Sequence, residues 1–340
     1  MATIVENIQT LQSIKTDIKD AIISKGVSVG NDFRTYAQAI TNLPSGGGCG
    51  TEMEDAFVQR TLSGYYSNDR VSIVGAYAFT SYSTLTSVNF QNCTSVGDYA
   101  FFYCTALTSV NLPNCKYINY YAFSDCFALT SVNLPNCTSI GYSVFTNCLA
   151  LTSVDLPNCE NIGVGAFYNC RSLTSINLPN CTYVGYSAFA RCSALLSIDL
   201  PNCSQVYTGA FYGCSSLTSI NLPNCIYVNG EAFYGCSSLT SINLPNCTTV
   251  GASAFACCSA LSLIKIPYCM IISRAAFVSC TNLTQVYLNS VTGVPSIYSS
   301  TFSNCPNLTS VYVPSSLVNA FKVASYWSSM SYKIVAYTGA

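Results

Sequence analysis

The chain has 340 residues, of which 50% are hydrophobic and only 8% are charged, against about 25% charged in a typical soluble domain. Its formal net charge is −1, and it has neither the basic cluster expected for nucleic-acid binding nor an acidic tail. It contains no histidine, which removes the commonest general base and metal ligand. The composition therefore argues against a nucleic-acid partner, a histidine-based active site and any metal or cofactor.

Residues 1–43 are predicted to form two short amphipathic helices. Gly26 ends the first helix, and Asp32 is a candidate N-cap for the second. Such helices cannot bury their apolar faces alone, so we expect them to pair or to pack against other chains. The candidate anchor or oligomerisation residues lie on one face of the first helix: Ile4, Ile8, Leu11, Ile18 and Ile22.

The first residues lack the basic segment and the continuous apolar stretch of a signal peptide, and no apolar run reaches about 18 residues. We therefore expect synthesis in a cytosol and no membrane insertion. Residues 44–50 read as a Gly-rich linker that contains Cys49, an exposed and reactive thiol by this interpretation. Residues 51–70 are predicted to be an atypical first coil that caps the following repeats.

Residues 71–313 repeat every 22 residues. The consensus within the chain is C-x-x-[VI]-x-x-x-A-F-x-x-C-x-x-L-T-S-[VI]-N-L-P-N. The first cysteine series runs from Cys93 to Cys269, and a second follows it by 11 residues, from Cys104 to Cys280. A strict period of this length predicts a solenoid in which each coil packs only on its neighbours.

The segment L-T-S-[VI]-N-L is the clearest strand of each unit and occurs about eleven times. In Leu129–Leu134, alternation places Val132 and Leu134 on one side and Ser131 and Asn133 on the other. Parallel stacking of these strands predicts a rod of about 50 Å. The last unit carries three extra residues around Pro295, and residues 314–340 are predicted to be a C-terminal cap with a helix over 315–327 and a strand over 333–337.

The patterns A-F-x-x-C, L-T-S-[VI] and N-L-P resemble the Treponema-type, or BspA-like, leucine-rich repeat over residues 57–340. The resemblance implies a leucine-rich-repeat solenoid of parallel β-strands. It implies less about function, because members of the family range from bacterial surface adhesins to uncharacterised proteins.

The flanking segments resemble bacteriophage and prophage structural proteins. The residues concerned are Ile14–Lys19 and Lys25–Val29 with Phe33, Tyr36 and Ala37, and the ending from Val313 to Trp327. This resemblance implies a virion fibre or decoration protein that docks on other virion proteins through residues 1–43, with a homotrimer as the expected state. The expected location is then the virion, and the alternative is a bacterial cell surface.

The cysteines allow three interpretations. Zinc sites use closer C-x2–4-C pairs, and a disulfide ladder would leave one of the 21 cysteines over and needs an oxidising compartment. We therefore expect two columns of buried free thiols, which act as small hydrophobic residues where the coil bends.

The carboxylates in the repeats occupy differing slots, except that Asp155 and Asp199 both replace the Asn of the strand. Two coils, about 10 Å, would separate them. A glycosidase pair is conceivable at that distance, but we interpret both as solvated surface residues and the protein as not an enzyme. A polysaccharide-degrading enzyme stays the least favoured alternative.

Tyrosines concentrate in the variable slots of the repeat, whereas the T-S-x-N face is nearly constant and is interpreted as structural. Tyrosine offers a large contact area at a low entropic cost and is enriched in binding surfaces. We therefore expect adhesion to a bacterial surface glycan or protein through these residues: Tyr99, Tyr103, Tyr117, Tyr120, Tyr142, Tyr168, Tyr183, Tyr186, Tyr207, Tyr212, Tyr227 and Tyr234.

Overall fold

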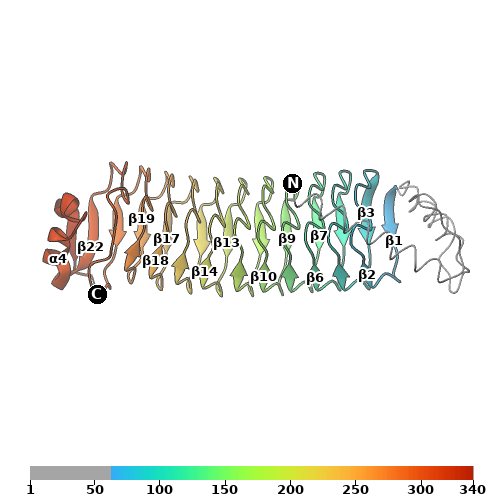
Figure 1. Ribbon diagram of the computed structural model, residues 1–340, viewed down its shortest axis with the longest axis horizontal. Helices are drawn as coiled ribbons and strands as arrows, with labels where there is room; N and C mark the ends of the chain where they lie inside the picture. The colour runs from blue at the N-terminus through green and yellow to red at the C-terminus, as the bar shows by residue number, and fades with distance from the viewer. Residues whose placement is uncertain (1–62, 340) are drawn as a thin grey trace, which may run out of the picture. The chain divides into compact units, whose positions relative to one another are not determined.

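The structure is a computed structural model that describes residues 63–339. The predicted helices of residues 1–43 with their candidate residues Ile4 to Ile22, the linker with Cys49, and residues 51–62 of the predicted cap lie outside the described residues. Residues 63–339 form an elongated stack of coils whose parallel strands line up in two rows along the stack (Figure 1). The predicted solenoid is thus confirmed.

The longer strand of each coil is the predicted L-T-S-[VI]-N-L segment, and eleven such strands are present, as expected. They are β3 (Leu85–Asn89), β5 (Ser109–Asn111), β7 (Ser131–Asn133), β9 (Ser153–Asp155), β11 (Ser175–Asn177), β13 (Ser197–Asp199), β15 (Ser219–Asn221), β17 (Ser241–Asn243), β19 (Leu263–Lys265), β21 (Gln285–Tyr287) and β22 (Ser310–Pro314). Strands β1 (Gly64–Ser67) and β23 (Ile334–Tyr337) extend the row at its two ends. The ladder of paired strands is interrupted between β11 and β13 and between β15 and β17.

The second sheet has ten strands of two residues each. They are β2 (Ile73–Val74), β4 (Ser95–Val96), β6 (Tyr117–Ile118), β8 (Ser139–Ile140), β10 (Asn161–Ile162), β12 (Tyr183–Val184), β14 (Gln205–Val206), β16 (Tyr227–Val228), β18 (Thr249–Val250) and β20 (Ile271–Ile272). Each strand pairs in parallel with its equivalent in the next coil, as Ile118 does with Ile140. The register therefore repeats the sequence period.

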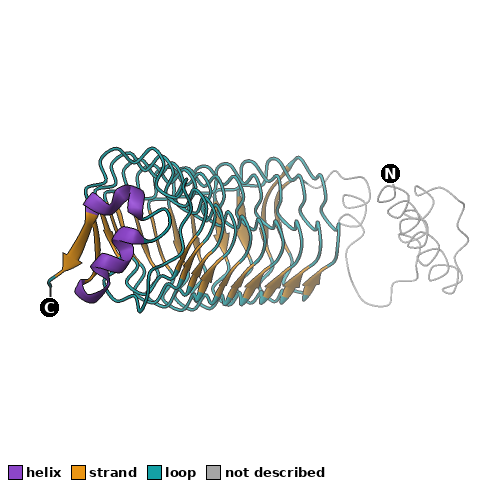
Figure 2. Ribbon diagram, turned by 60° about the vertical axis from the view of Figure 1, so that its left-hand side comes forward, coloured by secondary structure: helices purple, strands orange, loops and turns teal. Residues whose placement is uncertain are grey.

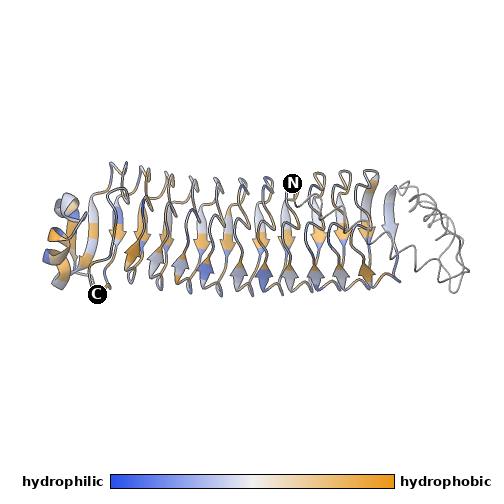
Figure 3. Ribbon diagram, in the orientation of Figure 1, coloured by the Kyte–Doolittle hydropathy of each residue, from blue (hydrophilic) through white to orange (hydrophobic). Residues whose placement is uncertain are grey.

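A column of phenylalanines fills the centre of the stack. Phe145 is fully buried and stacks on Phe123 and Phe167, with ring centroids 5.6 and 5.2 Å apart. The same contact links every Phe of the A-F motif, from Phe79 to Phe302. The strands contribute the remaining core: Val132 and Leu134 are buried while Ser131 and Asn133 are exposed, as predicted, and the apolar residues form a band along the main strands (Figure 3).

The turns of each coil contain residues in the left-handed region, most of them not glycine. Ser143 has φ 51° and Asn147 has φ 59°, and equivalent residues recur along the stack. This conformation costs roughly 1–2 kcal/mol for a residue with a Cβ. In this conformation the N–H groups of both residues donate to carbonyls of the next coil. Ser143 donates to Val164 and Asn147 donates to Tyr168, both at 2.9 Å. Hydrogen bonds between coils thus offset the local cost.

The C-terminal end is closed by short helices, as expected, although the α-helical part is shorter than the predicted 315–327. The 3-10 turn η1 (Ser315–Leu317) leads into α4 (Val318–Val323), and η2 (Ser328–Lys333) precedes β23; these helices cover the last coil (Figure 2). Trp327 contacts Phe302 and Phe321 at centroid distances of 6.1 and 5.1 Å. Its indole N–H donates to the Pro295 carbonyl at 2.8 Å, so the three-residue insertion supplies the acceptor for the residue that ends the phenylalanine column.

The close approach of coils is testable at one glycine slot. A Cβ on Gly163 would lie 2.5 Å from the Gly141 carbonyl oxygen, whereas a Cβ on Gly75, in the same slot of the first repeat coil, meets nothing within 4 Å. We expect Gly163→Ala to lower the free energy of unfolding by about 1–3 kcal/mol and Gly75→Ala to change it by less than about 0.5 kcal/mol. Urea unfolding followed by circular dichroism measures both, and equal losses would contradict the explanation.

Candidate binding surface

The outer face of the main strands is engaged in hydrogen bonds along the rod. The Thr108 hydroxyl donates to the Thr86 carbonyl at 2.9 Å, and the Asn111 amide donates to the Asn89 side-chain oxygen at 2.7 Å. Equivalent bonds recur one coil further on. These side chains therefore form hydrogen bonds with the neighbouring coils, as cross-strand pairs in a sheet do.

Asp155 and Asp199 belong to these ladders. Each carboxylate is exposed and accepts a hydrogen bond from the Asn one coil later, Asn177 at 2.8 Å and Asn221 at 2.7 Å. Both carboxylates therefore take part in the hydrogen-bond ladder on the exposed face of the main strands.

The cysteines form the two predicted columns. Every cysteine within residues 63–339 is free, and all are buried except the half-buried Cys257. In the second column the Cys126 thiol donates to the Phe101 carbonyl at 3.1 Å, and in the first the Cys137 thiol donates to the Ser139 carbonyl at 3.4 Å. Within the described residues no group of three or more Cys, Asp or Glu is arranged to hold a metal ion.

Burial holds most of these thiols in the neutral form. It raises the pKa of Cys104 to about 12 and that of Cys159 to about 11. Cys93 differs because a hydrogen bond with Cys115 lowers its pKa to about 7, and Cys269 lowers the pKa of Cys247 in the same way. The thiol columns are therefore mainly packing groups.

The thiol columns predict loss of stability at high pH. A thiol that ionises near its ordinary pKa of 9.0 when unfolded, but only near 12 when folded, contributes its full stability below pH 9 and loses it as pH rises toward 12. At pH 10 the loss is about 1.4 kcal/mol for each such thiol. Urea midpoints measured under reducing conditions from pH 7 to 10.5 should therefore fall steeply.

A matched pair of variants isolates this effect. Cys148 is buried with a pKa raised well above its ordinary value by desolvation, so Cys148→Ala should make the pH dependence shallower by about 1.4 kcal/mol per pH unit above pH 9. Cys257→Ala, at the half-buried position, is the control. An unchanged slope in the Cys148 variant would refute the assignment.

The twelve candidate tyrosines all reach the surface, but to different extents. Six are exposed: Tyr103, Tyr117, Tyr120, Tyr142, Tyr186 and Tyr227. Six are half-buried: Tyr99, Tyr168, Tyr183, Tyr207, Tyr212 and Tyr234. None belongs to the buried core.

The structure brings several of them together. Tyr99 lies between Tyr77 and Tyr121, with ring centroids 5.1 and 4.9 Å apart and planes within 10° of parallel. The sequence reasoning missed Tyr77 and Tyr121, although their spacing of 22 residues from Tyr99 was a usable signal. Because each ring face covers the next, this row presents ring edges and hydroxyls rather than open faces.

A second cluster lies further along the rod. Tyr183 and Tyr186 both contact Tyr207, at centroid distances of 4.9 and 5.1 Å, and both contacts are tilted by more than 50°. Tyr186 is exposed and Tyr183 and Tyr207 are half-buried, so each of the three side chains keeps some contact with solvent. Tyr212 and Tyr234 instead stack in parallel at 4.9 Å.

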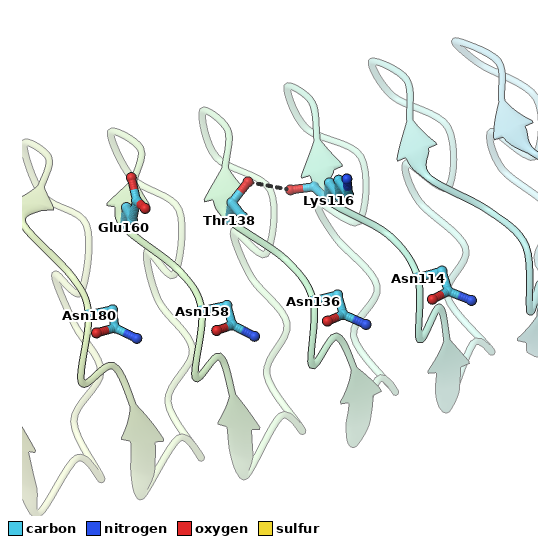
Figure 4. Close-up of a pocket in the computed structure, with 7 residues that line it drawn as sticks. All are labelled: Asn114, Lys116, Asn136, Thr138, Asn158, Glu160 and Asn180. Atoms are coloured by element: carbon cyan, nitrogen blue, oxygen red, sulfur yellow. Dashed lines mark hydrogen bonds between the residues drawn. The ribbon is translucent and has the colours of Figure 1, made fainter.

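A shallow polar groove of about 510 Å³ runs across four coils where the main strand turns toward the second sheet. Its lining residues form two rows, one of asparagines and one of residues that follow the first-column cysteines (Figure 4). They are Asn114, Asn136, Asn158 and Asn180 in one row and Lys116, Thr138 and Glu160 in the other. Sequence reasoning missed this groove because its asparagines are constant and resemble turn residues.

Comparisons with known proteins agree with this architecture. Residues 53–170, 138–228 and 204–331 match the BspA type leucine rich repeat region. No curated protein matches the chain. Within the described residues no helix is long and apolar enough to cross a membrane.

Several solved structures are similar to the chain. A leucine-rich repeat protein from Bacteroides ovatus has 21% identity and a TM-score of 0.45, over 81% of this chain and 92% of that one. A leucine rich cell surface protein from Faecalibacterium prausnitzii has 25% identity and a TM-score of 0.39, over 78% and 91%. The Treponema pallidum leucine rich repeat protein has 25% identity and a TM-score of 0.39, over 52% and 77%.

Proposed function

We propose that this chain, which belongs to the BspA-type leucine-rich-repeat family, is a non-enzymatic binding protein displayed at a bacterial cell surface. The resemblance of the repeats to this family is confirmed, and the family includes surface adhesins. The comparisons give no support to the phage resemblance of the flanking segments. The bacterial-surface alternative therefore replaces the virion interpretation.

The observation that carries the proposal is the placement of the tyrosines. They occupy variable slots on a sparsely charged rod, and Tyr183, Tyr186 and Tyr207 form a cluster of mutually tilted rings. A rigid aromatic cluster binds with little loss of conformational entropy. We expect this cluster to contact a glycan or protein on the opposing surface.

A non-enzymatic role fits the chemistry of the repeats. The chain has no histidine, and the two recurring carboxylates accept hydrogen bonds from neighbouring amides. Most thiols are buried and held neutral by desolvation. These groups are poorly suited to act as a base, an acid or a nucleophile.

Removal of the tyrosine cluster tests the binding function. The triple change Tyr183→Ser, Tyr186→Ser and Tyr207→Ser should weaken binding to ligands found on glycan and protein arrays by about tenfold or more, which corresponds to 1.4 kcal/mol. Tyr332→Ser is the control, because Tyr332 is 80% exposed in the C-terminal cap, away from the cluster. Retained binding in the triple variant, or an equal loss in the control, would exclude the cluster as the contact.

Antibody labelling of intact bacteria tests the location. We expect surface labelling of unpermeabilised cells that disappears after external protease treatment. Detection only in the cytosol would contradict surface display. Co-purification with phage particles instead would restore the virion interpretation.

A further inference from the structure

The asparagine row of the groove is a preorganised array of amides. The Asn136 amide donates to the Pro113 carbonyl of the preceding coil at 2.8 Å, and Asn158 donates likewise to the Pro135 carbonyl at 2.8 Å. Asn114 and Asn180 make the equivalent bonds. Within residues 63–339 no protein donor meets the side-chain oxygens of these four residues. Each amide is thus fixed with a free acceptor and one remaining N–H donor.

Two opposite charges stand along this array. Lys116 and Glu160 are exposed, and neither side chain has an ion pair or hydrogen-bond partner within the described part of the chain. Thr138 lies between them, and its hydroxyl donates to the Lys116 carbonyl at 3.2 Å. The same slot in other coils holds uncharged residues such as Thr182 and Thr248, so this pair of charges is particular to the groove.

The spacing of the two charged residues matches one conformation of a peptide ligand. Two coils at 4.7–4.9 Å each separate the backbones of Lys116 and Glu160 by roughly 10 Å. A polyproline II helix has three residues per turn and a rise of about 3.1 Å, so its residues i and i+3 lie on one face about 9.3 Å apart. A peptide in that conformation can present an acidic group to Lys116 and a basic group to Glu160 at the same time.

We propose that this groove binds a polyproline II peptide that carries an acidic and a basic side chain three residues apart. The backbone of such a peptide makes no internal hydrogen bonds. Its carbonyls can therefore accept from the free N–H of the asparagine amides, and its N–H groups can donate to the asparagine side-chain oxygens. A glycan fits less well, because the amino groups of natural glycans are mostly acetylated and leave Glu160 without a cation. This site goes beyond the proposed tyrosine contact and shares no residue with its tested cluster.

Fluorescence anisotropy on the full chain tests the proposal. The probes are fluorescein-labelled, end-capped peptides with the cores Glu-Pro-Pro-Lys and Lys-Pro-Pro-Glu, and one with an additional proline between the charges. We expect saturable binding of one of the two four-residue cores and at least tenfold weaker binding of the longer-spaced peptide. Equal binding of all three would overturn the selection by spacing.

Variants assign the contacts. Lys116→Thr and Glu160→Thr should each weaken binding at least tenfold. Lys265→Thr and Glu231→Ser remove the same charges outside the groove and should leave binding within twofold; Ser is chosen because Glu231 has φ 56° and equivalent slots hold Ser143 and Ser187. The double exchange Lys116→Glu with Glu160→Lys should reverse the preference between the two cores. Losses in the control variants, or no reversal, would overturn the proposal.

A final experiment distinguishes a peptide ligand from a glycan ligand. A hyaluronan hexasaccharide that binds in a Lys116-dependent way while no peptide binds would indicate a glycan site and refute the peptide. The tyrosine triple variant should bind the peptide normally. The two binding measurements are therefore independent. Absence of array binding with normal peptide binding would contradict the tyrosine contact alone, and the reverse result would contradict the peptide groove alone.

Discussion

Every part of this solenoid depends on one constraint, which is that each residue lies about 5 Å from its equivalent in the next coil. The phenylalanine rings meet this spacing with centroids 5.0–5.6 Å apart over most of the column. The asparagines of the main strands and the residues of the left-handed turns bond at the same interval. A Cβ on Gly163 would meet the backbone of the preceding coil, and Cys148 is fully buried. One spacing therefore explains why the phenylalanine, asparagine and cysteine slots are nearly constant from coil to coil.

The fold could be predicted because this spacing between coils appears in the sequence as a strict 22-residue period. The period fixed the register, and the alternation in L-T-S-[VI]-N-L fixed which side of the main strand is buried. The left-handed turns were not predicted, because residues such as Ser143 and Asn147 adopt that conformation only when the next coil offers a carbonyl. The role of Trp327 was also missed, since its contact with Pro295 joins residues 32 positions apart.

The candidate site was predictable only in part. Sequence variability pointed to tyrosines that do reach the surface. It could not distinguish a closed stack such as Tyr77, Tyr99 and Tyr121 from a tilted cluster such as Tyr183, Tyr186 and Tyr207. Ring orientation depends on which neighbours each coil supplies. The polar groove went unnoticed for the opposite reason, because its asparagines repeat so regularly that only Lys116 and Glu160 distinguish one stretch of it.

The cap built by Trp327 has a consequence for how such a gene changes. Because the indole closes the stack on an insertion found only in the last unit, the C-terminal end of the rod is chemically distinct from its middle, while the interior coils share one repeat pattern. Unequal recombination that adds or removes 22 codons between interior repeats would lengthen or shorten the rod by one layer and leave this end intact. The number of coils can therefore vary between related genes, whereas loss of the final unit would expose the phenylalanine column to solvent.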